Sequence, residues 1–233
     1  MYIINELAGM NMSPLWISIK TGIVSALVNF LLGTAAAYFI TRLGERKRWV
    51  LDSVLTMPLV LPPTAAGYLL LLLFSLNRPL GRLLFEQTGI RLIQTWLGCV
   101  VAATVISFPL MYRSARAAFE GVDDELIHAA RTLGLSEWSV FTKVVLPNAK
   151  AGLYSGAVTA FARAIGEYGA TSMLAGNILG KTRTMAVAVA AETAGGNYTA
   201  AGIWVAIIII TAFVIMLVSN LLTGRGMKGG RRI

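Results

Sequence analysis

Long blocks of apolar residues, separated by short polar stretches, dominate the sequence. The blocks cover approximately residues 15–40, 50–76, 95–119, 152–175 and 202–222. Each block approaches or exceeds the ~20 residues that an α-helix needs to cross the hydrocarbon core of a bilayer. The pattern therefore predicts an all-α integral membrane protein with about five transmembrane helices, organised as a single domain over residues 1–233.

Prolines and glycines modify this simple pattern. The second block contains Met57-Pro-Leu-Val-Leu-Pro-Pro63, and because proline lacks a backbone N–H, we expect this span to be bent or discontinuous. Pro109 predicts a kink in the third block. Gly152 and Gly156 form a small-xxx-small pattern that permits close helix approach. A short helical piece is expected around residues 184–193, between the fourth and fifth blocks.

The composition supports a membrane protein. Hydrophobic residues make up 56% of the chain and charged residues 13%, whereas soluble domains carry roughly 25% charged residues. The single cysteine, Cys99, lies inside an apolar block, which excludes a disulfide framework and a cysteine metal cluster. The first residues, 1–14, lack the pattern of a cleavable signal peptide, so the first span is expected to be retained.

The formal charge of +9 is unevenly distributed between alternate connections. One side of the membrane is richer in Lys and Arg and holds Arg42, Arg46, Lys47, Arg48, Arg113, Arg116, Arg131, Lys143, Lys150, Arg225, Lys228, Arg231 and Arg232. The poorer side holds Arg78, Arg82, Arg91, Lys181 and Arg183. Because basic residues concentrate on the cytoplasmic side, we expect the C-terminus inside and the N-terminus outside. The same residues are expected to contact membrane lipid, and nucleic acid is not expected as a partner.

A long polar connection at residues 120–150 carries most of the functional information. Asp123 and Asp124 suit the start of a helix, where carboxylates accept hydrogen bonds from free amides. An apolar stripe at helical spacing follows, and Gly134 is expected to end this helix. The stripe consists of Leu126, Ala129, Ala130 and Leu133.

A second helix is expected after this glycine. Ser136 can cap it, and the helix presents Trp138, Phe141 and Val145 before Pro147. Two interpretations of this helix pair are open from the pattern alone. The pair either docks into a groove of a soluble partner as a rigid lever, or it is an amphipathic loop on the membrane surface.

The connection resembles the EAA loop of ABC-importer permeases. The family pattern is Glu-Ala-Ala, three residues, Gly, nine residues, Ile, one residue and Leu-Pro. The corresponding residues, at matching spacing, are His128, Ala129, Ala130, Gly134, Val144, Leu146 and Pro147. Two positions differ, since His128 replaces the usual Glu and Val144 the usual Ile. In the family, this Glu could form a salt bridge to the ATPase subunit. Because His128 replaces it here, the sequence leaves open whether such a bridge forms.

The resemblance implies a type I ABC importer permease fold in which this loop is the coupling element. Two ATP-binding subunits would bind it on the cytoplasmic face, with ATP and Mg held there and no cofactor bound by this chain. The implied contact residues are Glu120, Gly121, Asp123, Leu126, His128, Ala129, Ala130, Leu133, Gly134, Leu146 and Pro147.

Two further segments are similar to one group of permeases. The run from Met57 to Phe74 is similar to the second span of molybdate permeases, and Phe161 to Thr171 resembles a segment shared by molybdate, tungstate and sulfate permeases. The resemblance implies a homodimer in a bacterial or archaeal cytoplasmic membrane, supplied by an external or periplasmic anion-binding protein. Molybdate is the expected substrate, with tungstate and sulfate as alternatives.

A charged pair lies in the fourth block. Arg163 and Glu167 are four residues apart, so they share a helix face and can pair, which offsets the ~2.5–3.5 kcal/mol that each charge costs at the centre of a span. We favour a structural pair over direct substrate binding. Hydroxyl side chains that stand alone in apolar runs are further candidates to line a pathway for an anion. Together with the charged pair, the candidate translocation pathway consists of Thr64, Ser107, Ser155, Thr159, Arg163, Glu167 and Thr171.

Other function classes fit the residues less well. The only histidine, His128, lies in the polar connection, so an intramembrane Ser-His dyad and a paired-histidine metal site are excluded. The chain has no Gly-rich phosphate loop and cannot supply its own ATPase. We therefore expect no catalytic residues and no metal site. An ion-coupled secondary transporter that uses Glu167 is the alternative.

Overall fold

The structure is a computed structural model that describes the backbone of residues 10–227 and the side chains of residues 10–218. Its elements are α2 (Ser13–Thr41), α3 (Glu45–Val60), α4 (Pro63–Phe74), α5 (Pro79–Thr88), α6 (Trp96–Glu120), α7 (Asp124–Thr132), α8 (Glu137–Val140), a π-helix (Phe141–Val145), α9 (Leu146–Ile165), α10 (Gly169–Leu174), α11 (Met185–Ala194) and α12 (Tyr198–Met227). This part of the chain is helical, as predicted. The predictions for residues 1–9, Lys228, Arg231 and Arg232 lie outside the described residues.

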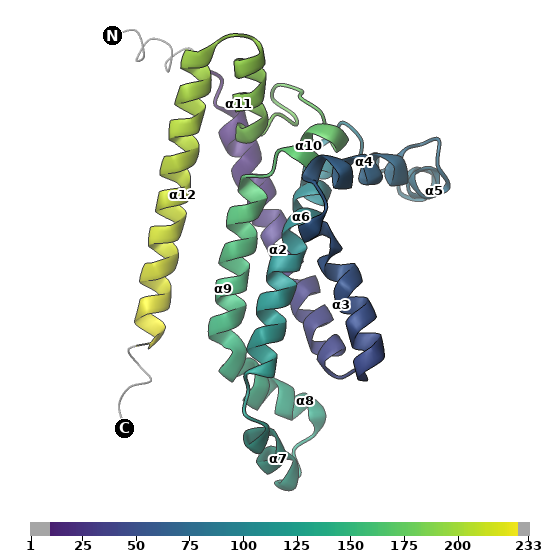
Figure 1. The fold of residues 1–233 in the computed structure, drawn as a ribbon, viewed down its shortest axis with the longest axis vertical. Coiled ribbons are helices and arrows are strands. Elements are labelled where there is room, and N and C mark those ends of the chain that lie inside the picture. The colour runs from purple at the N-terminus through teal and green to yellow at the C-terminus, as the bar shows by residue number, and fades with distance from the viewer. Residues whose placement is uncertain (1–9, 228–233) are drawn as a thin grey trace.

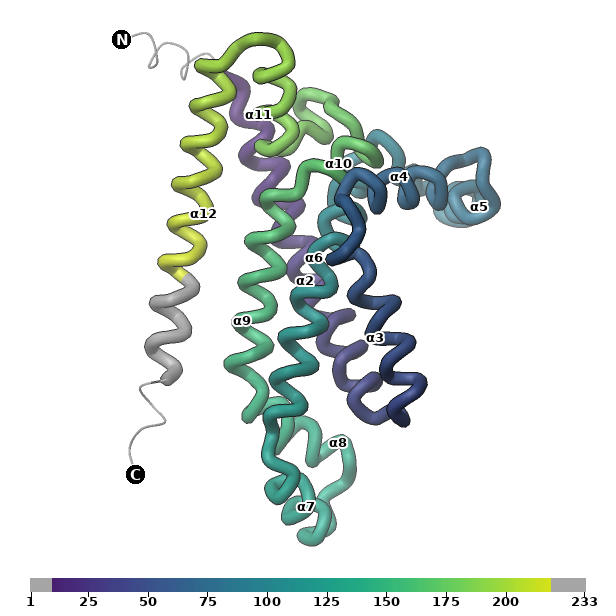
Figure 2. The backbone as a smooth tube through the Cα atoms, in the orientation of Figure 1, coloured from purple at the N-terminus to yellow at the C-terminus, as the bar shows by residue number. Residues whose placement is uncertain are grey.

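The bundle has two distinct ends (Figure 1). At one, called the α7 end, α7 and α8 project beyond the long helices, while α11 lies at the other, the α11 end. The α4 and α5 helices extend sideways from the bundle near the α11 end. Figure 2 shows α12 running beside the bundle and separated from most of it.

The long helices α2, α6 and α9 pack against one another and form the centre of the bundle. Small residues permit this close approach. A Cβ added to Gly152 would lie 2.5 Å from the Ala118 Cβ, and one added to Gly156 would lie 2.6 Å from the Ser114 Cβ. The predicted small-xxx-small pattern therefore places α9 directly on α6.

Buried polar side chains join α2 to α6. The Asn29 amide donates to the Ser107 hydroxyl (2.7 Å), and the Ser25 hydroxyl donates to the Val100 carbonyl (3.2 Å). Trp96 donates from its indole nitrogen to the Thr21 hydroxyl at 3.0 Å. Hydrogen bonds between helices are favourable in an apolar surrounding, because the alternative is an unsatisfied polar group.

The second apolar block is discontinuous, as its prolines predict. Pro62 and Pro63 lie at the break between α3 and α4, where the chain bends by 112°. Within residues 10–227, three helices are long and apolar enough to cross a membrane: Ser13–Thr41, Trp96–Glu120 and α12 over Tyr198–Val218. The bent α3–α4 pair is a further candidate span.

The fourth block differs from its predicted range of 152–175. The α9 helix begins earlier, at Leu146, and stops at Ile165, before the separate α10. Glu167 lies in the break between the two helices, and its carboxylate accepts the Ala170 N–H in the first turn of α10 at 2.7 Å. The α9 helix, which contains polar and small residues besides Lys150 and Arg163, is not among the helices that are apolar enough to qualify as spans.

Two other features of the sequence prediction need correction. The second loop helix does not stop before Pro147, since α8, the π-helix and α9 form one continuous helix. The wider π-turn accommodates a proline that lacks its N–H. The α5 helix, with Gly89 in a left-handed conformation at its end (φ 68°), was not predicted.

Candidate functional site

The α7 helix and the turn after it have a well-defined local structure. The Asp123 carboxylate caps the helix by accepting the Glu125 N–H at 2.9 Å. At the other end the Leu135 N–H donates to the Ala130 carbonyl (3.2 Å) and the Gly134 N–H to the Arg131 carbonyl (2.9 Å). This pair of bonds is a Schellman motif, and Gly134 has the left-handed φ of 78° that it requires. We refer to residues 123–140 as the α7–α8 element.

The apolar stripe predicted on α7 divides between two faces. Ala130 is buried and Ile127 is partly buried, and both contact the core at this end of the bundle. By contrast, Leu126 and Ala129 are exposed, and Leu133 is 82% exposed. The single-stripe prediction was wrong for Ala130, because residues 127 and 130 share the inward face of the helix.

Aromatic side chains fix α8 and the π-helix to the bundle. The ring centroid of Phe141 lies 4.2 Å from that of Tyr38 on α2 and 6.1 Å from that of Phe119 on α6. Val140 and Val145 are buried beside them. Trp138, in contrast, is 70% exposed. The element is thus packed on one side and leaves large apolar side chains on the other.

Ion pairs connect the element to α2. Arg131 binds both carboxylate oxygens of Glu137 (2.7 and 3.1 Å), and Arg42 contacts the same carboxylate at 3.4 Å. The hydrogen bond from Arg131 lowers the pKa of Glu137, and the same bond raises the pKa of Arg131. Both groups therefore stay charged at neutral pH, and the two helices of the element are held together across the Gly134 turn.

A second group of ion pairs joins the end of α6 to α3. Glu120 accepts from Arg116 at 2.8 Å and is also paired with Arg48. Arg116 additionally binds Asp52, which accepts from the Tyr112 hydroxyl at 3.0 Å. Each of these four charged side chains therefore has a partner of opposite charge.

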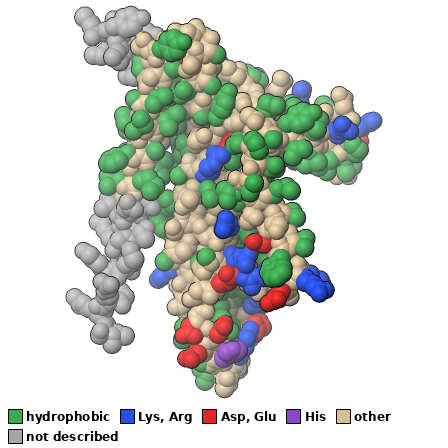
Figure 3. Space-filling model, in the orientation of Figure 1, with side chains coloured by type: hydrophobic (Ala, Val, Ile, Leu, Met, Phe, Trp, Pro, Cys, Tyr) green, Lys and Arg blue, Asp and Glu red, His purple; other side chains and the backbone are tan. Residues whose placement is uncertain are grey.

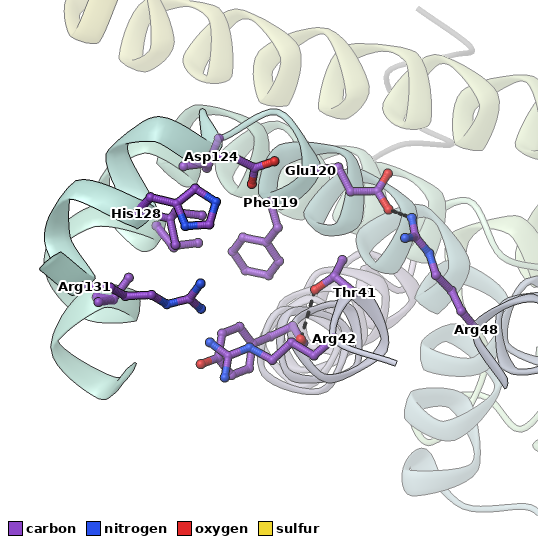
Figure 4. A pocket seen from close by; sticks show the side chains of 13 residues that line it. Thr41, Arg42, Arg48, Phe119, Glu120, Asp124, His128 and Arg131 are labelled. Carbon is purple, nitrogen blue, oxygen red and sulfur yellow. Dashed lines mark hydrogen bonds and ion pairs between the residues drawn. The ribbon is translucent and has the colours of Figure 1, made fainter. Parts of the chain in front are cut away.

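A cavity of about 430 Å³ separates the α7–α8 element from the ends of α2 and α6. In Figure 4, Asp124, His128 and Arg131 approach it from α7, while Arg48 reaches Glu120 from the opposite side. His128 is exposed at its rim. The lining carries both signs of charge, so the cavity has no strong preference for an anion or a cation.

The remaining predicted contact residues surround the element. Glu120 ends α6, and Gly121 follows it. Leu146 is partly buried against the core and Pro147 is exposed, both at the start of α9. Figure 3 shows charged side chains gathered at the α7 end, whereas apolar side chains lie along the coloured part of α12.

Comparison with known proteins decides the family. A family profile described as "Binding-protein-dependent transport system inner membrane component" matches residues 18–225. The chain belongs to this family. The permease is therefore an inner-membrane component of an ABC importer, and permeases of this kind work with ATP-binding subunits and a substrate-binding protein.

Curated relatives cover most of the permease. It is 41% identical to the molybdenum transport system permease protein ModB of Escherichia coli (strain K12), over 88% of this chain and 90% of the relative. The putative molybdenum transport system permease protein YvgM of Bacillus subtilis (strain 168) is 36% identical over the same shares. The sulfate transport system permease protein CysT of Escherichia coli (strain K12) is 32% identical, over 93% of this chain and 77% of the relative.

A solved structure supports the fold. A subunit of a bacterial ABC transporter involved in the import of the acidic polysaccharide alginate superposes with a TM-score of 0.80 at 13% identity, covering 97% of this chain and 83% of that one. At this identity the likeness concerns the fold alone. It agrees with the predicted type I ABC importer permease fold.

The predicted pathway residues of the permease fall into two groups. Ser155, Thr159 and Arg163 lie along one face of α9, at intervals of four residues, with Ser155 and Thr159 exposed. Arg163 pairs with the buried Glu167 at 2.7 Å, as the spacing predicts. Thr64 is the second residue of α4 and is exposed, and a Cβ added to Gly169 of α10 would lie 3.0 Å from the Thr64 backbone nitrogen.

Two further predicted pathway residues are buried, as Glu167 is. Ser107 is buried between α6 and α2, where it accepts from Asn29 and donates to the Ala103 carbonyl at 2.6 Å. Thr171 is buried in α10. The assignment of a pathway to these seven side chains stays a prediction.

The sequence reasoning missed Arg42, Asp52, Arg131 and Glu137 as parts of the site. Their pairs join different elements, and the six-residue separation of Arg131 and Glu137 spans a turn rather than one helix face. No periodic signal marks such pairs. Among the described residues, no group of three or more His, Cys, Asp and Glu side chains is placed to hold a metal.

Proposed function

We propose that the permease forms half of the pore of an ABC importer for molybdate or a related oxyanion, driven by ATP hydrolysis in partner subunits. The α7–α8 element is its coupling site. The observation that carries this proposal is the exposure of large apolar side chains on an element whose inner side is already packed. Leu133 and Trp138 are the most exposed of them, at 82% and 70%.

Docking on a soluble subunit explains this exposure better than contact with lipid. The element projects past the long helices, roughly along their direction, rather than spreading sideways (Figure 1). Burying Leu126, Leu133 and Trp138 in a groove would stabilise a complex through the hydrophobic effect. The charged residues around them would then form the polar rim of the interface.

The connections of the element suit the transmission of force. The α8 helix continues through the π-helix into α9 without a break. Phe141 contacts both Tyr38 and Phe119, so a displacement of the element is shared among α9, α2 and α6. Opening and closing of the ATPase pair, with ATP and Mg bound there, would switch the pore between its two orientations.

Two observations support an oxyanion as the substrate. The permease is 41% identical to one molybdenum permease and 32% identical to a sulfate permease. In addition, Ser155, Thr159 and Arg163 place hydroxyl and guanidinium donors along one face of α9. Glu167 balances the charge of Arg163 at 2.7 Å, which suits a route that must release its anion rather than hold it.

The pore requires a second subunit in this proposal. One α9 provides one line of donors, and a homodimer would enclose the route between two such lines. The α7 end is assigned to the cytoplasm because most basic residues lie there, which puts the C-terminus inside and the N-terminus outside. An external anion-binding protein would deliver the substrate to the α11 end.

Reconstitution tests the proposal directly. The permease is expected to co-purify as a dimer with two ATPase subunits and to take up molybdate into vesicles only with ATP and the binding protein. Competition by tungstate and sulfate then ranks the anions. Uptake driven by a proton or sodium gradient, with this chain alone, would instead support a secondary transporter and contradict the proposal.

Substitution of Leu133 tests the docking surface. Leu133→Asp should lower ATPase binding at least tenfold while leaving the permease folded, because it puts a charge into the proposed interface. Leu133→Met is the matched control, since it keeps an apolar side chain of similar size. Equal ATPase binding by all three proteins would contradict docking through this face.

A further inference from the structure

A second cavity, of about 440 Å³, lies at the α11 end, away from the α7–α8 element. Side chains from α2, from the start of α6 and from the segment before α11 surround it. They are Trp16, Ile17, Lys20, Gln94, Thr95, Trp96, Gly180 and Lys181. Two lysines line this cavity and no carboxylate does, so its lining is positively charged.

The two lysines are not neutralised by neighbours. Within residues 10–218, neither Lys20 nor Lys181 forms an ion pair. The Lys20 ammonium instead lies over the Trp96 ring, 3.8 Å from its centroid. The α6 helix begins at Trp96, so the positive end of its dipole adds to the potential at the cavity. An anionic group is therefore the ligand that this lining favours.

The backbone of the cavity wall is held in an unusual conformation. Gln94 has a φ of 58°, the only positive φ of a non-glycine residue in the described chain. Its N–H donates to the Leu174 carbonyl at 3.1 Å, which anchors the wall to α10. A left-handed conformation is unfavourable for glutamine, and such strain persists where the surrounding structure fixes it.

An apolar surface continues from the cavity along α2. Ile23, Leu27 and Leu31 follow Lys20 at intervals of three, four and four residues, so all four share one helix face. The exposed fractions of the three apolar side chains are 46%, 61% and 68%. Trp16, one turn before Lys20, is also exposed at 69%. Tryptophan and lysine above an apolar stripe are typical of the membrane interface.

We propose that this cavity binds the phosphate of an anionic phospholipid, between Lys20 and Lys181, with an acyl chain along Ile23, Leu27 and Leu31. A free oxyanion offers the same charge and hydrogen-bond acceptors, but it would not use the apolar stripe. The stripe therefore favours lipid as the source of the anionic group. This site is separate from the proposed translocation route and does not depend on it.

Retention of lipid during purification is the first test. Wild-type permease should keep phosphatidylglycerol through extensive detergent exchange. The double variant Lys20→Gln/Lys181→Gln should retain at least about tenfold less of this lipid. Arg78→Gln/Arg91→Gln removes two basic side chains at the same end but outside the cavity, and should match the wild type. Equal retention by all three proteins, each monodisperse on size exclusion, would overturn the proposal.

Lysine labelling distinguishes lipid from free anion. In nanodiscs containing phosphatidylglycerol, Lys20 and Lys181 should react with an amine reagent several-fold more slowly than in phosphatidylcholine nanodiscs. Added molybdate should not slow the reaction in phosphatidylcholine. Equal rates in both lipids, or protection by molybdate alone, would overturn the assignment to phospholipid.

Discussion

The cavities at the two ends of the bundle differ in how their basic residues are paired. At the α7 end, Arg42 and Arg131 share Glu137, while Arg48 and Arg116 share Glu120. At the α11 end, the two lysines of the cavity have no carboxylate partner among the described residues. Paired charges fix the relative positions of helices, whereas unpaired charges remain able to bind an anion.

The exposed apolar side chains near the two cavities also lie on different kinds of structure. At the α7 end, the exposed Leu133 and Trp138 belong to a compact element that projects from the bundle. From the cavity at the α11 end, Ile23, Leu27 and Leu31 continue along the side of a long helix that is suitable for crossing a membrane. The first arrangement suits a protein partner and the second suits lipid.

The largest expected effect comes from Gly134→Pro. Gly134 has a φ of 78° and its N–H donates to Arg131, and proline permits neither. ATP-coupled uptake in reconstituted vesicles should fall to background, while the protein still inserts. Gly89→Pro is the matched control, because Gly89 has a φ of 68° and donates to Phe85 at 2.8 Å, but ends α5 near the α11 end. Normal uptake by the Gly134 variant would show that the α7 end does not take part in coupling.

The next effect separates the two faces of α7. Ala130→Asp places a carboxylate in the packed face and should lower the free energy of unfolding by about 2 kcal/mol, with a reduced Tm. Ala129→Asp lies on the exposed face and should leave the Tm unchanged but weaken ATPase binding. Thermal unfolding and pull-down of the ATPase measure the two effects. The same Tm for both variants would contradict the division of faces.

The smallest effect concerns pH. The hydrogen bond from Arg131 lowers the pKa of Glu137 below its ordinary value of 4.5. The pair therefore stabilises the folded state fully above that value and is lost as the pH falls through the lowered pKa. Glu137→Gln should lower the Tm by a constant amount between pH 6 and about 8, because Glu is ionised there in both states. A Tm difference that changes across this range would show that another group controls the pair.

Features with a local signal were predictable from the sequence. Long apolar runs gave α2, α6 and α12, and the Pro62-Pro63 pair gave the break between α3 and α4. Gly134 gave the turn of the α7–α8 element, and the four-residue spacing gave the Arg163–Glu167 pair. Each depends on neighbours in the chain.

Features that depend on tertiary contacts were not predictable. The inward position of Ala130 is decided by where α7 meets the bundle, and the helix runs through Pro147 because a π-turn makes room for it. Glu137 meets Arg42 only because the start of α8 lies beside the end of α2. The cavity at Lys20 and Lys181 likewise joins residues far apart in sequence.

Labelling of Leu133→Cys in the assembled importer tests the central claim most directly. The only native cysteine, Cys99, is buried, so background labelling by a maleimide should be low. The introduced cysteine should react rapidly in the permease alone and at least tenfold more slowly with the ATPase subunits bound, while Leu80→Cys on α5 reacts equally in both. Rapid labelling of position 133 in an importer that still hydrolyses ATP and transports would contradict the assignment of the α7–α8 element as the coupling site.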